Sequence, residues 1–433
     1  MQVGKRTGSI LESSRRSPEL PLWRPVEQHF PRRALASVED AVRSELAKSE
    51  IEATIRPGMR VAIAVGSRGI ANVDRIVRTL VEGLRQRGAE PFIVPAMGSH
   101  GGGTAEGQTE VLAGYGVDEE RVGAPVRASM ETVELGTTEG GISVYTDRTA
   151  HEQADVVIPV ARVKPHTDFR APIESGLHKM LTIGLGKHRG ASTIHTYPLS
   201  RFGEVITEVG QFIIGKGRVP FGLAAVEDGN EDTALIEAVP AAGMLVRERE
   251  LLVLAKEWFP RLPFASADVL LVSMLGKNIS GSGMDPNVTG RFPQNSVPAH
   301  VELGRLIVLD LTEETHGNAC GMGLADITTR RLAEKVDTVK TYTNHVTAQL
   351  LDGARLPLVA ESDLEALQVA VTTLRRTPSE RARIAWIEST LRVGHLWMSE
   401  PLWDEVKDSE SLRSVGDPQP IAFDAEGNLL LGD

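Results

Sequence analysis

The chain has 433 residues, enough for two or three domains, and its 41% hydrophobic and 24% charged residues are typical of a globular protein. Its 47 lysines and arginines against 58 acidic residues give a formal net charge of −11, which argues against a nucleic-acid-binding protein. No apolar run approaches the roughly 18 residues of a membrane span, and the polar start Met1–Pro18 is not a signal peptide, so we expect a cytoplasmic protein without a membrane partner.

The N-terminal part of the chain alternates between apolar strands and amphipathic helices. Met1–Arg33 is rich in proline and arginine, and we expect an irregular arm there, suited to packing on a partner subunit in a homo-oligomer. The apolar run Arg60–Val65 is typical of a parallel strand buried on both faces, and the loop Gly66–Asn72 follows it. Further strands are expected at 91–95, 155–163 and 221–226, helices at 34–49, from Ile76 to Gly88, from Ala105, at 172–183 and at 201–214, and a hairpin at 131–147.

A second series of elements begins after the proline-containing stretch Phe259–Pro263. Its loop Gly276–Asn287 is too rich in glycine for an ordinary connection and is expected to close over a ligand. Strands are expected at 267–274, 306–311 and 383–387, helices at 324–336 and 363–374, and a turn at 424–427 between two short strands.

These patterns predict an α/β protein with a doubly wound, Rossmann-like N-terminal domain and a second α/β domain. We expect a catalytic and cofactor-binding domain over 1–262 and a C-terminal domain over 263–433, whose terminal tail packs back on the first domain. The active site is expected in the cleft between the two domains, because loops at the carboxyl ends of parallel strands share one edge of a sheet.

The segment Val163–His195 follows a buried strand and is unusually rich in cations. Such density is hard to explain as solvated surface, so this segment is our candidate active site. Its basic side chains are His166, His178, His188, His195, Lys164, Lys179, Lys187, Arg170 and Arg189.

A second candidate, His100, lies in the glycine-rich stretch Gly98–Thr104 between a strand and a helix. An imidazole there is suited to acid–base chemistry near neutral pH, and the following helix start favours an anion. The alternative is a surface loop with an incidental histidine. The stretch lacks the Lys-Ser/Thr pair of a P-loop, which argues against a nucleoside triphosphate.

The residues alone leave several roles open. His166 and His195 bracket Lys179 and would suit metal coordination, proton transfer or anion binding, whereas His178 and His188 are expected to face solvent. Arg68 and Lys277 would clamp a carboxylate, with solvated surface charges as the alternative.

Several motifs together resemble the nickel-pincer lactate racemase family. Gly176-Leu177-His178-Lys179 is similar to the family's lysine motif, and His195 follows Lys179 at the family's interval. Pro165-His166 and His100 match its two catalytic histidines, and Val65–Asn72 is similar to its Asp-x-Thr-Arg-x-x-x-Asn loop with Val65 in place of the aspartate.

The resemblance implies a nickel-pincer nucleotide cofactor made by separate biosynthesis proteins. Lys179 would bond it covalently and His195 would bind its nickel. His100 and His166 would be the acid–base pair. The remaining site residues implied are Gly66, Ser67, Arg68 and Lys277 for the cofactor, with Arg68 and Lys277 also holding the substrate carboxylate.

The implied activity is racemisation or epimerisation of a 2-hydroxy acid by hydride transfer. Departures near the substrate loops suggest an acid other than lactate, with malate as a narrower interpretation if Arg170 and Arg291 are spare cations. One alternative is a zinc-dependent hydrolase using His100, His166 and His195, because the single cysteine excludes a four-cysteine site. Another is a non-catalytic anion-binding protein.

Overall fold

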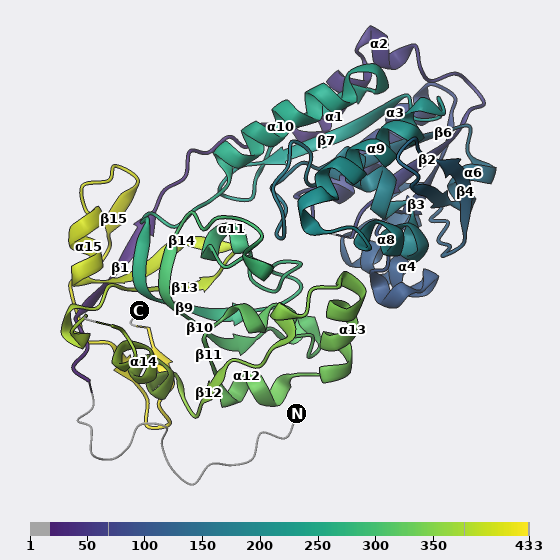
Figure 1. Cartoon of the computed structure of the whole chain (residues 1–433). Helices are drawn as coiled ribbons and strands as arrows, with labels where there is room; N and C mark the ends of the chain where they lie inside the picture. Colours follow the sequence, from purple (N-terminus) through teal and green to yellow (C-terminus); the bar gives the residue numbers. More distant parts are fainter. Residues whose placement is uncertain (1–17, 68, 376, 432–433) are drawn as a thin grey trace. The chain divides into compact units, whose positions relative to one another are not determined.

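The computed structural model describes residues 18–67, 69–375 and 377–431. Their backbone forms two compact units (Figure 1). The first is Pro31–Phe259, which we call the five-stranded unit after its main sheet. The second, the eight-stranded unit, combines the described residues up to Phe30 with those from Pro260 onward.

The sheet of the five-stranded unit has the strand order β3-β2-β6-β7-β8. All neighbours are parallel except β8, which runs antiparallel to β7. In chain order this is 2-1-3-4-5, the order of a doubly wound sheet, so the expected Rossmann-like class is confirmed. The strands are β2 (Arg60–Val65), β3 (Glu90–Pro95), β6 (Val156–Arg162), β7 (Phe221–Glu227) and β8 (Thr233–Pro240).

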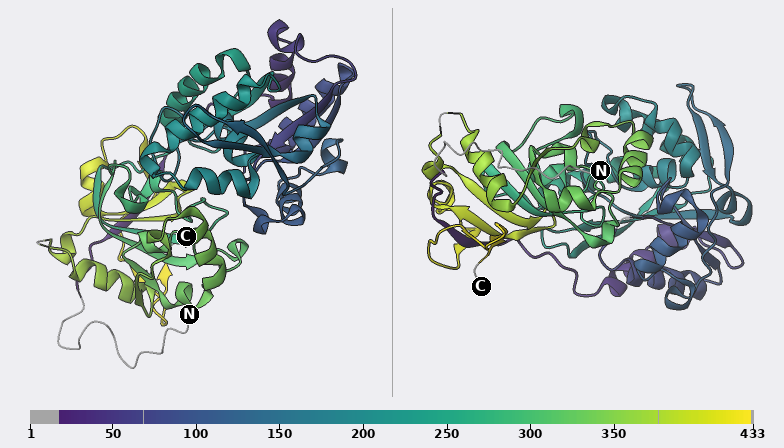
Figure 2. Two further views of the ribbon diagram at one scale, coloured as in Figure 1. Left: turned by 45° about the vertical axis from the view of Figure 1, so that its right-hand side comes forward. Right: turned by 90° about the horizontal axis from the view of Figure 1, so that it is seen from below.

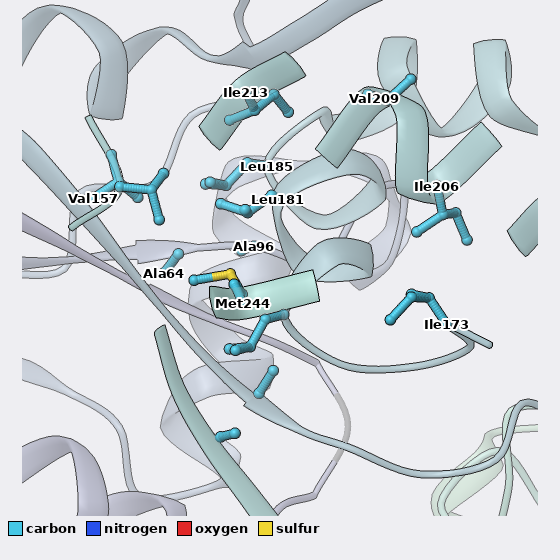
Figure 3. Close-up of a cluster of buried hydrophobic side chains, with 14 of the residues drawn as sticks. Ala64, Ala96, Val157, Ile173, Leu181, Leu185, Ile206, Val209, Ile213 and Met244 are labelled. Carbon is cyan, nitrogen blue, oxygen red and sulfur yellow. The ribbon is translucent and has the colours of Figure 1, made fainter. Parts of the chain in front are cut away.

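Both faces of this sheet are covered because its strands are apolar on both sides. On β2, Val61, Ile63 and Val65 face one core cluster, and Ala62 and Ala64 face the other. Figure 3 shows the second cluster, where small side chains of the sheet meet larger ones from the helices. The continuous apolar run of β2 therefore reflects burial on both faces of the sheet, as expected for a parallel strand.

The helices expected at 34–49, from Ile76 to Gly88, from Ala105 and at 201–214 are present, whereas the long helix Met244–Trp258 and several short helices were not predicted. The expected hairpin is β4 (Thr132–Thr137) with β5 (Ser143–Asp147). The helices are α1 (Val38–Leu46), α2 (Ser49–Glu52), α3 (Val73–Gln86), α4 (Ala105–Gly114), α5 (Glu119–Val122), α6 (Arg148–Gln153), α7 (Leu177–Lys179), α8 (Lys187–His195), α9 (Phe202–Gly215) and α10 (Met244–Trp258), with a π-helix, η2, over Met180–Gly184.

The expected helix over 172–183 is wrong in its first half, because helical structure begins only at Leu177. Ser175 instead pairs with Lys164 in a short antiparallel bridge. The Glu174 carboxylate accepts hydrogen bonds from the backbone N–H groups of His166 and Ala171, and so replaces helical hydrogen bonds with loop contacts.

The eight-stranded unit has the strand order β12-β11-β10-β9-β13-β14-β1-β15. Strands β9 to β13 pair in parallel, and the remaining pairs are antiparallel. Its strands are β1 (Trp23–Gln28), β9 (Ser266–Leu275), β10 (Glu302–Leu311), β11 (Ile327–Thr329), β12 (Leu358–Ala360), β13 (Ile384–Ser389), β14 (Arg392–Ser399) and β15 (Leu412–Ser414). Its helices are α11 (Pro286–Thr289), α12 (Arg330–Lys335), α13 (Thr338–Ala348), α14 (Asp363–Thr372) and α15 (Glu400–Val406).

The irregular arm expected over 1–33 is wrong for β1, which lies between β14 and β15 as the purple strand among yellow ones in Figure 2. Trp23 and Val26 of β1 are buried, and the Trp23 ring lies 4.9 Å from that of Trp397. The sequence boundary drawn at 262 falls close to the end of the five-stranded unit at Phe259, but residues 18–30 belong to the other unit.

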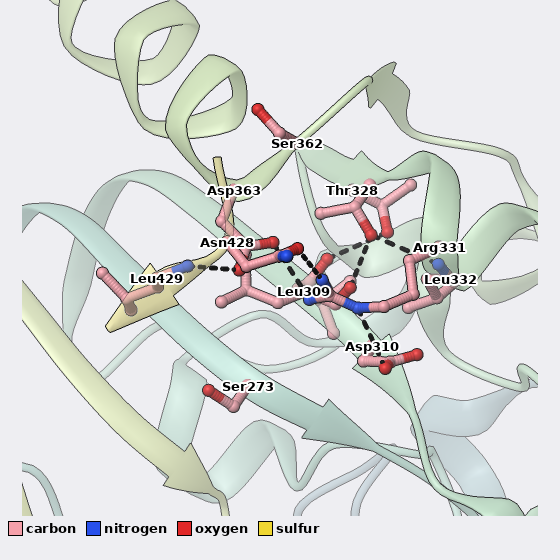
Figure 4. Close-up of polar contacts among 12 residues, drawn as sticks. Ser273, Leu309, Asp310, Thr328, Arg331, Leu332, Ser362, Asp363, Asn428 and Leu429 are labelled. Atoms are coloured by element: carbon pink, nitrogen blue, oxygen red, sulfur yellow. Dashed lines mark hydrogen bonds and ion pairs between the residues drawn. The ribbon is translucent and has the colours of Figure 1, made fainter. Parts of the chain in front are cut away.

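The helix expected over 324–336 is also wrong in its first half, which forms β11 beside β10. The helix α12 starts only after Thr329, whose hydroxyl accepts the N–H of Leu332 as an N-cap. Figure 4 shows Arg331 of α12 in ion pairs with Asp310 and Asp363. These contacts hold α12 on the sheet, whereas the apolar pattern alone had predicted one continuous helix over 324–336.

The expected terminal turn is present between β16 (Ala422–Phe423) and β17 (Leu429–Leu430), within the eight-stranded unit. Leu429 N–H donates to the Asp363 carboxylate at the start of α14. A search of the described residues finds no helix with the length and apolar character needed to cross a membrane.

Candidate functional site

Three loops at the carboxyl edge of the five-stranded sheet carry the candidate residues. They follow β2, β3 and β6, and the neighbours β2 and β6 mark the point where the strand order reverses. Open α/β sheets bind ligands at this point. The π-helix η2 joins two of the loops, because Gly98 N–H donates to Gly184 O at 3.0 Å and a Cβ on Gly66 would lie 2.8 Å from Met180 Cε.

His100 is exposed on the loop after β3 and meets the loop after β2. Its Nδ1 lies 2.5 Å from the hydroxyl oxygen of Ser67. The Tyr115 hydroxyl donates to the carbonyl oxygen of Ser67 at 2.9 Å and so fixes this loop from α4's end. Ser67 and His100 are 33 residues apart in the sequence and are in contact, as expected for loops that lie at the same edge of a sheet. Arg68 lies outside the described residues.

His166 and Lys179 are in direct contact. Lys179 Nζ lies 2.6 Å from His166 Nε2, and Asp168 N–H donates to His166 Nδ1 at 3.0 Å. This arrangement places the side-chain amine of Lys179, the nucleophilic group of a lysine, in hydrogen-bond contact with an imidazole whose other nitrogen is held by the backbone.

His195, the last residue of α8, presents one ring nitrogen with a lone pair. Its Nδ1–H donates to Ala191 O at 2.6 Å, which leaves Nε2 as the unprotonated atom of the neutral ring. Burial lowers the pKa of His195 below its ordinary value, which keeps the ring neutral. A neutral imidazole whose other nitrogen is fixed by a carbonyl is a typical metal ligand.

Two phenylalanines connect His195 to His166. The His195 ring lies 5.4 Å from Phe202, Phe202 lies 5.5 Å from Phe169, and Phe169 lies 4.4 Å from His166. Both phenylalanines are buried. These rings form an apolar surface between the two histidines. The hydrophobic periodicity of the sequence did not predict it.

Glu174 is the buried acid that shapes the His166 loop. Besides the two backbone N–H groups, its carboxylate accepts from Lys256 Nζ at 2.5 Å and pairs with Arg170 at 3.5 Å. Arg170 also donates to the carbonyl oxygen of His166 at 2.7 Å. Sequence reasoning missed Glu174 because its partners are the backbone and a lysine 82 residues away.

The remaining histidines of the segment differ from each other. His188 is exposed, as expected. His178 was expected to face solvent, and this is wrong: it is fully buried, its Nδ1–H donates to Glu248 at 2.5 Å, and Gln211 contacts its Nε2 at 2.7 Å. These partners on α9 and α10 satisfy the ring, so His178 holds helices together.

Lys277 and Arg291 lie in the eight-stranded unit. Lys277 Nζ donates to Gly281 O at 2.7 Å within the glycine-rich loop after β9. Arg291 pairs with Asp326 at 2.9 Å and donates to Leu303 O, so it is a structural cation in its own unit and does not support the malate interpretation.

The described residues give the zinc alternative no support. Within 18–67, 69–375 and 377–431, no group of three or more His, Cys, Asp or Glu side chains is arranged to hold a metal ion. His100, His166 and His195 all lie in these ranges and therefore do not form the three-ligand set that catalytic zinc requires. A metal at His195 would need its other ligands from a bound group.

The N-terminal part of the chain is similar to a known family. Residues 19–201 match the family model of the lactate racemase N-terminal domain. Residues 19–201 form a lactate racemase-like N-terminal domain. The expected resemblance is thereby confirmed, and the matched range contains Ser67, His100, His166, Lys179 and His195 but not Lys277.

Solved structures extend the likeness beyond the lactate racemase domain. The lactate racemase apoprotein from Thermoanaerobacterium thermosaccharolyticum is 15% identical, with a TM-score of 0.52 over 87% of this chain and 94% of that one. At this identity the likeness concerns the fold, which both units share with that enzyme. A protein from Thermotoga maritima is 15% identical over 75% of this chain and 84% of its own, with a TM-score of 0.46. No curated protein matches the chain in sequence.

The half-buried His195 makes the stability of the protein depend on pH. Because its folded-state pKa is lowered, the unfolded chain binds a proton more readily once the pH falls below about 6.5. We expect the free energy of unfolding of the cofactor-free protein to fall between about pH 7 and pH 5. The decline should be smaller in His195→Asn, measured by urea denaturation. An equal decline in both proteins would contradict the burial of a neutral ring; His151, whose pKa burial also lowers, contributes to both.

Proposed function

We propose that this protein is an isomerase that racemises or epimerises a 2-hydroxy acid with a nickel-pincer nucleotide. The contact between Lys179 Nζ and His166 Nε2, inside a lactate racemase domain, is the observation that carries the proposal. It pairs a nucleophilic amine with an acid–base group at the ligand-binding edge of the sheet.

The donor set fits the cofactor. Lys179 would hold it covalently through its amine, and His195 Nε2 would complete the coordination of nickel, a metal that accepts nitrogen and sulfur ligands. The buried rings of Phe169 and Phe202 would exclude water beside it. When bound, this cofactor supplies an acceptor for the hydride from Cα of the substrate. Proteins that synthesise the cofactor are the implied partners.

The histidines move the hydroxyl proton. The Cα–H of a 2-hydroxy acid is too weakly acidic for an imidazole to remove, whereas its hydroxyl proton is within reach of a base as the hydride departs. The two enantiomers direct their hydroxyl groups differently, so each needs its own base. We assign these roles to His166, aligned by the Asp168 N–H, and to His100, aligned by Ser67.

The substrate carboxylate would be bound by cations. Lys277 would exchange its hydrogen bond to Gly281 O for a carboxylate, and Arg68 is proposed from the sequence motif alone. The narrower proposal of malate now depends on Arg170, whose guanidinium lies in the His166 loop and is 31% exposed. A second carboxylate there would compete with Glu174 for this cation.

A racemisation assay tests the proposal. The chain would be produced together with the cofactor biosynthesis proteins, and loading would be verified by nickel content. Single enantiomers of lactate, malate and other 2-hydroxy acids would then be followed by chiral chromatography. We expect at least one acid to reach the same mixture from both enantiomers. A loaded protein that alters none of them would instead be an anion-binding protein, and the proposal would fail.

A further inference from the structure

Lys187 occupies an unusual position at the start of α8. Its side chain is fully buried, and its φ of 52° lies in the left-handed region that disfavours residues with a side chain. Glycine would adopt this backbone without strain. A buried lysine kept in such a conformation indicates that the side chain itself is required.

The ammonium group of Lys187 has three partners. It donates to Pro95 O at the end of β3 and to Gln108 Oε1 at 3.0 Å, and it lies 3.3 Å from Asp147 Oδ2. Burial lowers the pKa of Lys187 and raises the pKa of Asp147, so burial works against the charged forms of both. The ion pair with Asp147 therefore does not by itself explain the choice of lysine.

Gln108 connects Lys187 to the loop that carries His100. Its Nε2 donates to Gly98 O at 2.9 Å and to His100 O at 3.3 Å. Only one orientation of the amide serves all of these partners, with Oε1 toward Lys187 and Nε2 toward the loop. The lysine thus sets the direction of an amide that is fully buried and that holds the backbone of His100.

Lys187 also belongs to the segment that carries the other site residues. It opens the helix that ends at His195, and η2 between it and Lys179 is bound to the same loop through Gly98 and Gly184. The chain from Lys179 to His195 and the loop of His100 therefore meet at Lys187 as well as at Gly98 and Gly184.

We propose that Lys187 is a positioning residue that fixes the backbone of His100 through Gln108, and so aligns that base with the segment bearing Lys179 and His195. Its role in catalysis rests on the proposed function. Its role in ordering the loop does not, and is measurable in the cofactor-free protein.

Hydrogen–deuterium exchange of the full-length, cofactor-free chain tests the positioning role. In Lys187→Met and Gln108→Met, we expect amide exchange in the peptide covering 98–104 to become at least about tenfold faster. Gln108→Glu should do the same, because it keeps an acceptor for Lys187 but loses both donors to the loop. Because Gln108→Glu keeps Lys187, it still provides the test if Lys187→Met does not fold.

Two variants separate this role from simple structural loss. In Asp147→Asn an uncharged amine on Lys187 still donates to Pro95 and Gln108, so exchange over 98–104 should stay within about twofold of the wild type. Lys216→Met, at an exposed lysine, should change nothing. Unchanged exchange in both Gln108 variants, or equal acceleration in Asp147→Asn and Lys187→Met, would overturn the proposal.

Kinetics of the loaded enzyme give the second readout. Lys187→Met and Gln108→Met should lower kcat with little change in KM, and the double variant should be no worse than the poorer single variant, because both residues act in series. Losses of kcat that multiply in the double variant would refute this serial action. Faster loop exchange in a loaded enzyme without racemase activity would refute the proposed function while leaving the positioning role intact.

Discussion

Replacing Lys179 by alanine is expected to leave the protein without covalently bound cofactor and to reduce racemisation below detection. The side-chain amine of Lys179 is the nucleophile assigned to this bond, and it lies 2.6 Å from His166 Nε2 at the ligand-binding edge of the sheet. Intact-mass spectrometry after production with the biosynthesis proteins measures the loss directly. The nickel content should fall with it, because His195 alone is one ligand.

Two matched variants make this result specific. Lys179→Arg keeps a basic side chain of similar length but offers no nucleophilic amine, and it should also lack the adduct. Lys216→Ala removes a lysine whose side chain lies over Phe212, away from the assigned site residues, and should retain it. A cofactor-sized mass increase on Lys179→Ala would show that another residue forms the bond.

Removing either of the two proposed acid–base histidines is expected to affect the two enantiomers differently. Positioned general bases contribute about 10²–10⁴-fold, so His100→Ala and His166→Ala should each lower overall racemisation by that order. The equilibrium constant between enantiomers is one, so the steady-state loss of kcat/KM is equal in both directions. A single-turnover experiment is therefore needed, in which formation of the 2-oxo acid is measured from each enantiomer alone.

The two variants should fail with opposite enantiomers in that experiment. His166→Ala removes the partner of Lys179 as well, so cofactor loading must be measured first and rates expressed per loaded site. His188→Ala, an exposed histidine on the same segment, serves as the control and should behave as wild type. Equal losses with both enantiomers in both variants would contradict separate bases.

The sequence predicted the parallel strands well because their signal is local. Apart from a charged residue at one end of each, Arg60, Glu90 and Arg162, the strands β2, β3 and β6 are apolar at every position. Such short continuous runs between turns are typical of parallel strands buried on both faces. The same reasoning failed at 324–336, where a short buried strand and an amphipathic helix follow one another without a break in the apolar pattern.

Strand β1 was missed for a related reason. Only Trp23 and Val26 of its six residues are buried, at a spacing of three, so it has neither the alternation of a surface strand nor a continuous apolar run. Its place is decided by pairing with β14 near the other end of the chain. Such long-range pairing is invisible to local patterns.

In the candidate site, too, the sequence predicted the residues with a local signal and missed those that depend on long-range contacts. His100, His166, Lys179 and His195 are recognisable because imidazole and amine groups are distinctive after buried strands. Their supports are ordinary residues whose importance depends on tertiary contacts. Glu174 lies in a segment that the sequence pattern predicts to be a helix. Lys187 contacts Gln108, which is 79 residues away in the sequence.

One measurement tests the central claim most directly: peptide mapping of the wild-type protein made with the biosynthesis proteins, combined with nickel analysis of that protein and of His195→Ala. The account predicts a single adduct on the peptide containing Lys179, about one nickel per chain in the wild type, and an adduct with little nickel in His195→Ala. An adduct on a different residue, or full nickel content without His195, would contradict it.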